Sequence, residues 1–384
     1  MLDLRAHFSR FLNADPERLH FAAHSHHPWP DVTREAQLEA WDDAARLIDD
    51  KWGRILGPVL DDFRRHVAGH LRLPDPSTIA VAPNTHEFVR RILSCFPADR
   101  PVRILTSDGE FHSFTRQITR LEEDGLVAVT RIPAEPFATF DERFRSAARE
   151  AHDLVFVSQV FFNSGFAIDL DGLADHVGDA MLVIDGYHGF MARPTDLSRL
   201  ASRAFYLAGG YKYAMAGEGA CFMHCPPGWG LRPRDTGWYA AFRNLAKAQG
   251  GKVAYSEDAW RFMGATFDPS GLYRFNAVMR WIEETGLTVA AIHDHVLALE
   301  ERFLGHLDPA SGLRPEALVV PPQESRRGNF LTFDMPDAQQ TYERLKTLRV
   351  VTDVRGNRLR LGFGLYQTYE EMDELIRRLG GSAG

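Results

Sequence analysis

Three features are scarce in this 384-residue chain, and each scarcity excludes a class of protein. It has only three cysteines, Cys95, Cys221 and Cys225, which fits a reducing compartment and excludes a disulfide framework. It has no cluster of basic and aromatic residues, and its net charge is −8, so we expect no nucleic-acid partner. It has no apolar run that could span a membrane, and residues 1–10 do not resemble a signal peptide. We therefore expect a cytoplasmic protein without membrane partners.

The composition is that of a globular protein with an ample core. Hydrophobic residues make up 45% of the chain and charged residues 25%. A chain of this length suggests two domains, or one large α/β domain with an appendage.

Short apolar runs recur along the chain and alternate with helical patterns. We expect seven strands, at residues 79–82, 102–106, 127–129, 154–157, 181–184, 204–208 and 220–223. This alternation predicts an α/β fold with a mostly parallel sheet that is covered by helices on both faces. A small α+β unit follows, with expected strands at residues 318–320, 329–334 and 358–363.

The chain is organised around Lys212. An apolar run ends at Ala208, and Gly209 and Gly210 then lead to this lysine. A lysine placed between two core strands is unfavourable unless its amine is used. Burial lowers the pKa of a lysine, and a neutral amine is what a Schiff base requires.

A second ionisable residue, Asp185, ends the preceding apolar run, and His188 follows three residues later. The C-terminal end of a parallel strand is where α/β enzymes bind their ligands. A carboxylate there can keep a pyridine nitrogen protonated, which makes pyridoxal 5'-phosphate (PLP) an electron sink. The alternative is a structural ion pair between Asp185 and Lys212.

The segments Asp185-Gly186-Tyr187-His188 and Tyr211-Lys212-Tyr213 resemble kynureninase, within the class V aminotransferase group. The resemblance implies the fold of type I PLP-dependent transferases, with a seven-stranded sheet and a small C-terminal domain. We expect an N-terminal segment at 1–55 that contributes to the small domain and the active-site mouth. A PLP-binding domain at 56–275 and a small domain at 276–384 follow it.

The resemblance also implies cofactor-binding residues in the first half of the chain. Asn84 and Thr85 begin a helix, and a helix N-terminus is an anion site that would bind the phosphate. Phe111 would stack on the pyridine ring, although a core aromatic is the alternative. The loop with Ser158 and Asn163 would reach the phenolic oxygen and the imine end.

Further site residues follow from the resemblance in the second half. Tyr211 and Trp238 would lie near the cofactor, and Thr266 would reach the phosphate from a partner subunit. Each active site would then need two chains, so we expect a homodimer. Arg360 would bind the α-carboxylate of the substrate through its bidentate fork.

A histidine-rich stretch, His24-Ser25-His26-His27, replaces the Asn-Ser-Leu-Gly that kynureninase-like proteins carry near the active-site mouth. We expect His26 to contact the substrate. A metal site and a solvated loop are alternatives; no carboxylate or cysteine lies close by in the sequence, so we assign no metal ligand.

The resemblance assigns catalysis to Lys212, Asp185 and His188. The expected function is a PLP-dependent reaction on an amino acid through a Lys212 Schiff base. Transamination and the Cβ–Cγ hydrolysis of kynureninase use the same aspartate, lysine and arginine, so both remain open. A non-catalytic scaffold and a histidine-cluster metalloprotein also remain open.

Overall fold

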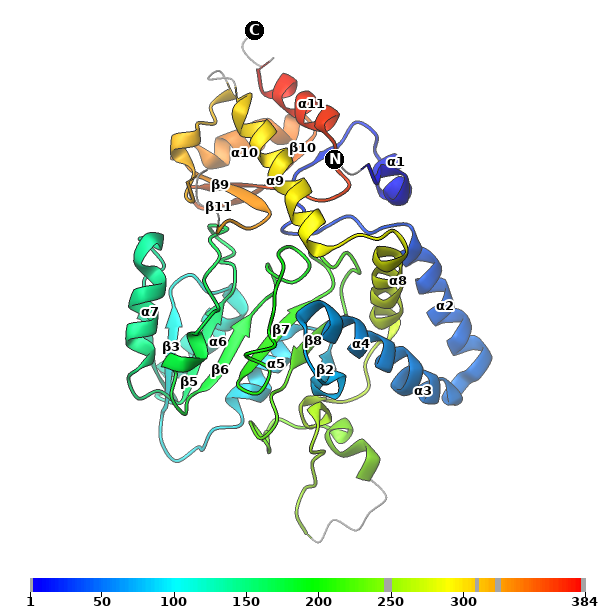
Figure 1. The fold of residues 1–384 in the computed structure, drawn as a ribbon, viewed down its shortest axis with the longest axis vertical. Helices are drawn as coiled ribbons and strands as arrows, with labels where there is room; N and C mark the ends of the chain where they lie inside the picture. Colours follow the sequence, from blue (N-terminus) through cyan, green and yellow to red (C-terminus); the bar gives the residue numbers. More distant parts are fainter. Residues whose placement is uncertain (1–2, 245–250, 308–310, 322–325, 381–384) are drawn as a thin grey trace.

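A seven-stranded sheet forms the centre of the computed structural model, which describes residues 3–244, 251–307, 311–321 and 326–380 (Figure 1). Its strands lie in the order β2-β8-β7-β6-β5-β3-β4. They are β2 (Ile79–Ala82), β3 (Val102–Ser107), β4 (Val127–Ile132), β5 (Leu154–Ser158), β6 (Met181–Asp185), β7 (Ala204–Gly209) and β8 (Cys221–His224). Neighbouring strands are parallel except where β8 is involved. The expected seven strands and the mostly parallel sheet are confirmed.

The burial of each strand explains its sequence. All residues of β5 and β7 are buried, as expected for central strands that are covered on both faces and read as continuous apolar runs. β4 lies at the edge of the sheet, and most of its side chains are only partly buried or exposed. Its sequence accordingly includes the polar residues Thr130 and Arg131.

Helices flank the sheet. They include α2 (Val32–Leu47), α4 (Leu60–Leu71), α5 (Thr85–Leu93), α6 (His112–Glu123), α7 (Phe140–Ala148) and α8 (Ser270–Glu284). The Asn84 side chain caps α5 by accepting a hydrogen bond of 3.1 Å from the backbone N–H of Glu87. α2 packs along α8 at the periphery of the molecule, away from the sheet (Figure 1).

A second unit contains the antiparallel strands β9 (Phe330–Asp334), β11 (Asp353–Arg355) and β12 (Arg358–Gly362). The helices α9 (Val289–Gly305), α10 (Ala338–Thr347) and α11 (Tyr369–Gly380) surround them (Figure 1). The N-terminal strand β1 (Leu19–His20) pairs with β10 (Val350–Val351), so the first residues of the chain lie against this unit.

The prediction of a strand at residues 318–320 is wrong. Only Leu318 pairs there, in an isolated bridge to Phe333, and Pro321 follows, which has no N–H to extend a ladder. Two expected strands of this unit, at 329–334 and 358–363, are confirmed as β9 and β12.

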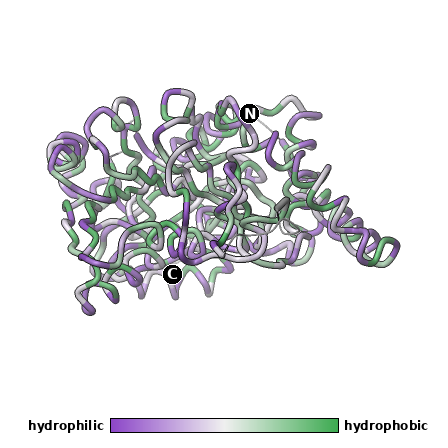
Figure 2. Tube along the Cα trace, turned by 90° about the horizontal axis from the view of Figure 1, so that it is seen from below, coloured by the Kyte–Doolittle hydropathy of each residue, from purple (hydrophilic) through white to green (hydrophobic). Residues whose placement is uncertain are grey.

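Two large hydrophobic clusters support these two units. One surrounds the seven-stranded sheet, and the other contains Leu19 and Phe21 together with side chains of α9, α11 and β12. Figure 2 shows hydrophobic segments through the interior of the trace and hydrophilic ones at its rim. The domain boundaries at 55/56 and 275/276 stay a prediction. No helix in the described ranges is both long and apolar enough to cross a membrane.

We predict opposite stability effects for two glycine-to-alanine substitutions. A Cβ at Gly186 would overlap the buried ring of Tyr206, so Gly186→Ala should lower the free energy of unfolding by about 1–3 kcal/mol. Gly69 lies inside α4, and a Cβ there would meet no atom within 4 Å, so Gly69→Ala should raise it by about 0.5–1 kcal/mol. Urea denaturation measures both, and equal shifts in the same direction would contradict this packing.

Candidate active site

Lys212 lies just beyond the C-terminal end of β7 with only 5% of its surface exposed. Gly209, the last residue of β7, leaves no room for a side chain, because a Cβ there would overlap both the Tyr187 hydroxyl and Cys221 Sγ. The glycine therefore allows β7, Tyr187 and β8 to approach closely, and the lysine follows on a short, buried connection.

The Lys212 amine is held in an environment that disfavours its charge. Burial lowers its pKa to about 7, although the nearby Asp185 carboxylate opposes this shift. Its Nζ lies 2.7 Å from His188 Nε2. Burial and the Lys212 amine lower the pKa of His188 well below its ordinary value, so this imidazole is neutral at pH 7.

Three aromatic rings face the amine. Nζ lies 4.7 Å from the ring centroid of Tyr187, 5.4 Å from that of Phe111 and 5.5 Å from that of Tyr211. Ring faces attract a cation, so they favour the ammonium form that burial disfavours. The three rings also line the cavity beside the amine.

Asp185 ends β6, directly opposite Ser158 of β5 in the sheet register. Its Oδ1 accepts a hydrogen bond of 2.9 Å from the Tyr187 backbone N–H. Burial raises the pKa of this carboxyl, while the Tyr187 N–H and Lys212 lower it. The carboxylate and the lysine amine therefore stabilise each other's charged forms.

These groups share one cavity of about 450 Å³, within the size range of small-molecule sites. It brings together eight of the residues expected at the site: Asn84, Thr85, Phe111, Ser158, Asp185, His188, Tyr211 and Lys212. The cavity combines a buried amine, a carboxylate, an aromatic face and the N-terminus of α5. His188 Nδ1 is buried and has no hydrogen-bond partner in the described part of the chain. This donor set fits PLP.

Three expected cofactor residues lie outside that cavity. Asn163 follows β5, and its backbone carbonyl accepts a hydrogen bond from Arg358. Trp238 is 44% exposed and stacks on Tyr239. Thr266 lines a separate hollow of about 160 Å³ with Tyr239 and Arg91. Their roles stay predictions.

The two expected substrate residues also lie outside it. His26 is exposed and stacks on Tyr211, with ring centroids 5.4 Å apart. Arg360 is buried on β12, where it forms an ion pair with Asp353 and donates a hydrogen bond to the Phe162 carbonyl. Its guanidinium lies 5.8 Å from the Phe162 ring, and that ring lines the cavity.

Sequence reasoning missed several cavity neighbours. Glu110, one residue before Phe111, is a buried carboxyl that accepts hydrogen bonds from Ser107 and Ser158. Its position three residues after a core strand was the available signal. Cys221 lines the cavity, but burial raises the pKa of its thiol to about 12, which makes it a poor nucleophile.

The histidine-rich stretch does not converge on one point. The His24 ring stacks on Phe330, His26 stacks on Tyr211, and His27 makes an edge contact with Tyr366. Within residues 3–244, 251–307, 311–321 and 326–380, no group of three or more His, Cys, Asp or Glu side chains could hold a metal ion.

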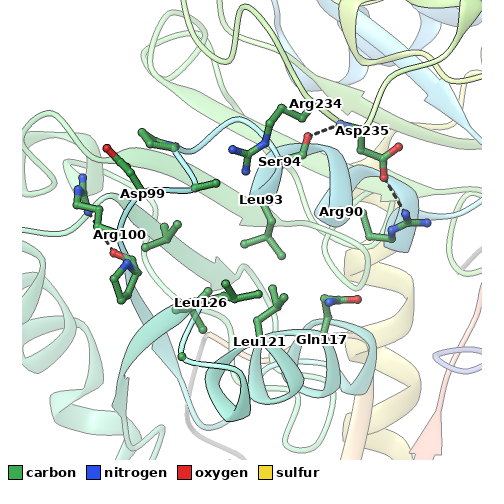
Figure 3. Close-up of a pocket in the computed structure, with 16 residues that line it drawn as sticks. Arg90, Leu93, Ser94, Asp99, Arg100, Gln117, Leu121, Leu126, Arg234 and Asp235 are labelled. Carbon is green, nitrogen blue, oxygen red and sulfur yellow. Dashed lines mark hydrogen bonds and ion pairs between the residues drawn. The ribbon is translucent and has the colours of Figure 1, made fainter.

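A larger hollow of about 580 Å³ lies elsewhere, between α5, α6 and the starts of β3 and β4 (Figure 3). Its floor is apolar, with Leu93, Leu121 and Leu126, and Arg90 is paired with Asp235 at its rim (Figure 3). Because it contains neither a lysine nor a histidine, we assign the chemistry to the smaller Lys212 cavity.

Comparison with known proteins agrees with this geometry. The model of the aminotransferase class-V family matches residues 57–375. Kynureninase of Pseudomonas fluorescens is 25% identical over 234 residues, which cover 59% of this chain and 55% of that protein. The match thus spans about half the length of that relative. The uncharacterised aminotransferase YcbU of Bacillus subtilis is 22% identical over 327 residues, and this match covers 82% of both chains.

Solved structures with the same fold include a cystine C–S lyase and a cysteine desulfurase. The cystine C–S lyase C-DES has a TM-score of 0.80 at 17% identity, over 94% of this chain and 97% of that chain. A cysteine desulfurase from Thermococcus onnurineus has a TM-score of 0.81 at 17% identity, over 99% and 98% of the two chains. At these identities the structures establish the fold alone.

We predict that Lys212 reacts with an acylating reagent at a lower pH than an exposed lysine does. Labelling with acetic anhydride, followed by mass spectrometry, should show Lys212 reactivity rising through a pH of about 7. Asp185→Asn should shift this profile to lower pH, because the carboxylate favours the ammonium form. The exposed Lys346 in the same sample is the control. A Lys212 profile centred near the ordinary value of 10.5 would contradict the burial.

Proposed function

The chain belongs to the aminotransferase class-V family of PLP-dependent enzymes, and we propose that it acts on an amino acid through a Schiff base at Lys212. One observation carries this proposal. The buried Lys212 amine, with a pKa of about 7, shares its cavity with Asp185 and lies within hydrogen-bond distance of neutral His188.

The residues that would hold PLP come from adjacent strand ends. Asp185 would bind the ring nitrogen, Phe111 would cover a face of the ring, and Asn84 and Thr85 at the start of α5 would bind the phosphate. Bound PLP withdraws electrons from the bonds at the α-carbon of an amino acid.

The proton chemistry falls to Lys212, His188 and Asp185. Because its pKa is about 7, the Lys212 amine is partly neutral at physiological pH and can take and return a proton at the substrate α-carbon. Neutral His188 can accept a hydrogen bond from Nζ and so orient it. Asp185 lines the cavity, where its ionised carboxylate would favour a cationic partner.

The three thiols argue against a cysteine nucleophile. Burial raises the pKa values of Cys95, Cys221 and Cys225 to about 12 each. A thiolate nucleophile needs a lowered pKa, so a thiol-dependent desulfurase is not favoured. We assign transamination as the first candidate reaction. Hydrolytic cleavage of a Cβ–Cγ bond is the second, supported by the kynureninases of P. fluorescens and Deinococcus radiodurans at 25% and 26% identity.

A second copy of the chain is the partner that this architecture favours. Leu38 and Trp41 are exposed about one turn apart on α2, and Ile48 is exposed just beyond the end of this helix; we call these three residues the apolar stripe. Trp41 is 69% exposed, although it is large and apolar. Thr266, which lies outside its own chain's Lys212 cavity, is then available to the cavity of the partner.

We predict that Lys212 forms the covalent link to PLP. Borohydride reduction of the purified enzyme should leave a pyridoxyl group on Lys212, and Lys212→Ala should lose it while Lys346→Ala keeps it. Mixing the enzyme with an amino-acid panel and no keto acid then separates the reactions. Accumulation of pyridoxamine phosphate means transamination, and release of anthranilate from kynurenine means Cβ–Cγ hydrolysis. Absence of any pyridoxyl adduct would refute the proposal.

The dimer is tested separately. Trp41→Lys should weaken self-association about tenfold or more, because a charge would enter the apolar stripe, and sedimentation velocity at several concentrations measures the effect. Leu126→Lys, at an exposed leucine outside this stripe, is the matched control and should leave association unchanged. Equal behaviour of the two variants would place the interface elsewhere.

A further inference from the structure

A buried carboxyl that the proposed chemistry does not use lies beneath the Lys212 cavity. Glu110 follows β3 and is 3% exposed. Its Oε1 accepts hydrogen bonds from Ser107 Oγ (2.5 Å) and from the Ser158 backbone N–H (3.2 Å). Its Oε2 lies 2.6 Å from Ser158 Oγ. Ser158 in turn lines the cavity, so Glu110 contacts the site through this one hydroxyl.

The hydrogen bonds of the two Glu110 carboxyl oxygens indicate that a proton would lie on Oε2. Oε1 already accepts two hydrogen bonds, whereas Oε2 has one partner, Ser158 Oγ. A carboxylic acid donates one hydrogen bond, and a hydroxyl can accept it and donate its own hydrogen elsewhere. Ser107 is buried and already accepts from the Gly109 N–H. If a serine accepts the proton of Glu110, its own hydroxyl hydrogen must point elsewhere. Of the two serines, only Ser158 lines the cavity, so only its hydrogen can point into it.

We propose that Glu110 is a positioning residue that carries a proton on Oε2 and donates it to Ser158 Oγ, so that the Ser158 hydroxyl donates into the Lys212 cavity. An ionised Glu110 imposes the opposite direction, because its Oε2 accepts the Ser158 hydrogen and leaves only lone pairs toward the cavity. The proposal rests on PLP occupying this cavity, where anionic oxygens of the cofactor need donors.

The charges around Glu110 favour the protonated form. Asp185, at the end of the strand next to Ser158, is the charged group that faces it, and two carboxylates so close disfavour ionising both. On its own loop, Asp108 accepts a hydrogen bond from the Ala134 N–H, and His112 contacts the Phe162 ring. Burial, and then Asp185, raise the pKa of Glu110 to about 7, against the opposing effect of the two serines. The donating arrangement is therefore present below pH 7 and is lost above it.

Cofactor affinity across this pH range tests the proposal. Lys212 titrates over the same pH range in every variant, so each variant is compared with the wild type at the same pH. Glu110→Gln places an amide that always donates, so the ratio of wild-type affinity to Glu110→Gln affinity for PLP should fall about fivefold to tenfold as the pH rises through 7, the worth of one hydrogen bond. Ser158→Ala removes the donor, so its affinity should be lower than that of Glu110→Gln by the same factor at every pH. The affinity is measured by fluorescence quenching on titration with PLP.

Glu300 provides the matched control. It is also fully buried, with its pKa raised to about 7, but it lies on α9 and pairs with Arg327, outside the Lys212 cavity. Glu300→Gln should keep the wild-type pH response. A Glu110→Gln protein that keeps the pH response, or a Ser158→Ala protein that keeps it, overturns the proposal. If the Glu110→Gln protein does not fold, the result for Ser158→Ala alone tests the proposal. A wild-type protein that binds no PLP overturns the proposed function instead.

Discussion

The site depends on the burial of one amine. Removing an ammonium group from water is costly, yet Lys212 is buried, with only 5% of its surface exposed. Two features keep this cost limited: the Asp185 carboxylate opposes the loss of charge, and three ring faces surround Nζ. Burial outweighs the carboxylate and lowers the pKa of Lys212 from 10.5 to about 7. The amine is then nucleophilic at neutral pH and can still carry a proton.

The sheet order explains why residues so distant in sequence meet at this amine. β3, β5, β6 and β7 are neighbours, and parallel strands present their C-terminal ends at one edge. Glu110, Ser158, Asp185 and Lys212 follow or end these four strands in that order. β8 runs the other way, so it contributes its first residue, Cys221, to the same edge. The antiparallel strand β8 thus completes the wall of the Lys212 cavity without the crossover connection that a parallel strand would need.

Much of this edge could be predicted from sequence, because each residue is tied to an apolar run that the sheet must bury. Asp185, Lys212, Phe111 and Asn84 all lie within a few residues of such a run, and all line the cavity. Trp238 begins a short 3-10 helix and Thr266 lies in a loop before α8; the positions of both depend on tertiary packing, which periodicity does not describe. Glu110 was missed because a charged loop residue usually indicates solvent exposure.

The resemblance assigns Arg360 to the substrate carboxylate, and its ion pair would make that recognition an exchange of partners. In this structure, Asp353 occupies one arm of the guanidinium, and the Phe162 carbonyl occupies another. Leaving a buried carboxylate unpaired costs about 3–5 kcal/mol, so a substrate carboxylate that displaced Asp353 without compensation would bind poorly. Asp353 has a second cation, however: Arg355 Nη1 lies 2.9 Å from its other oxygen. If Arg360 has the predicted role, a substrate carboxylate would take the place of Asp353 on Arg360 while Asp353 stayed paired with Arg355.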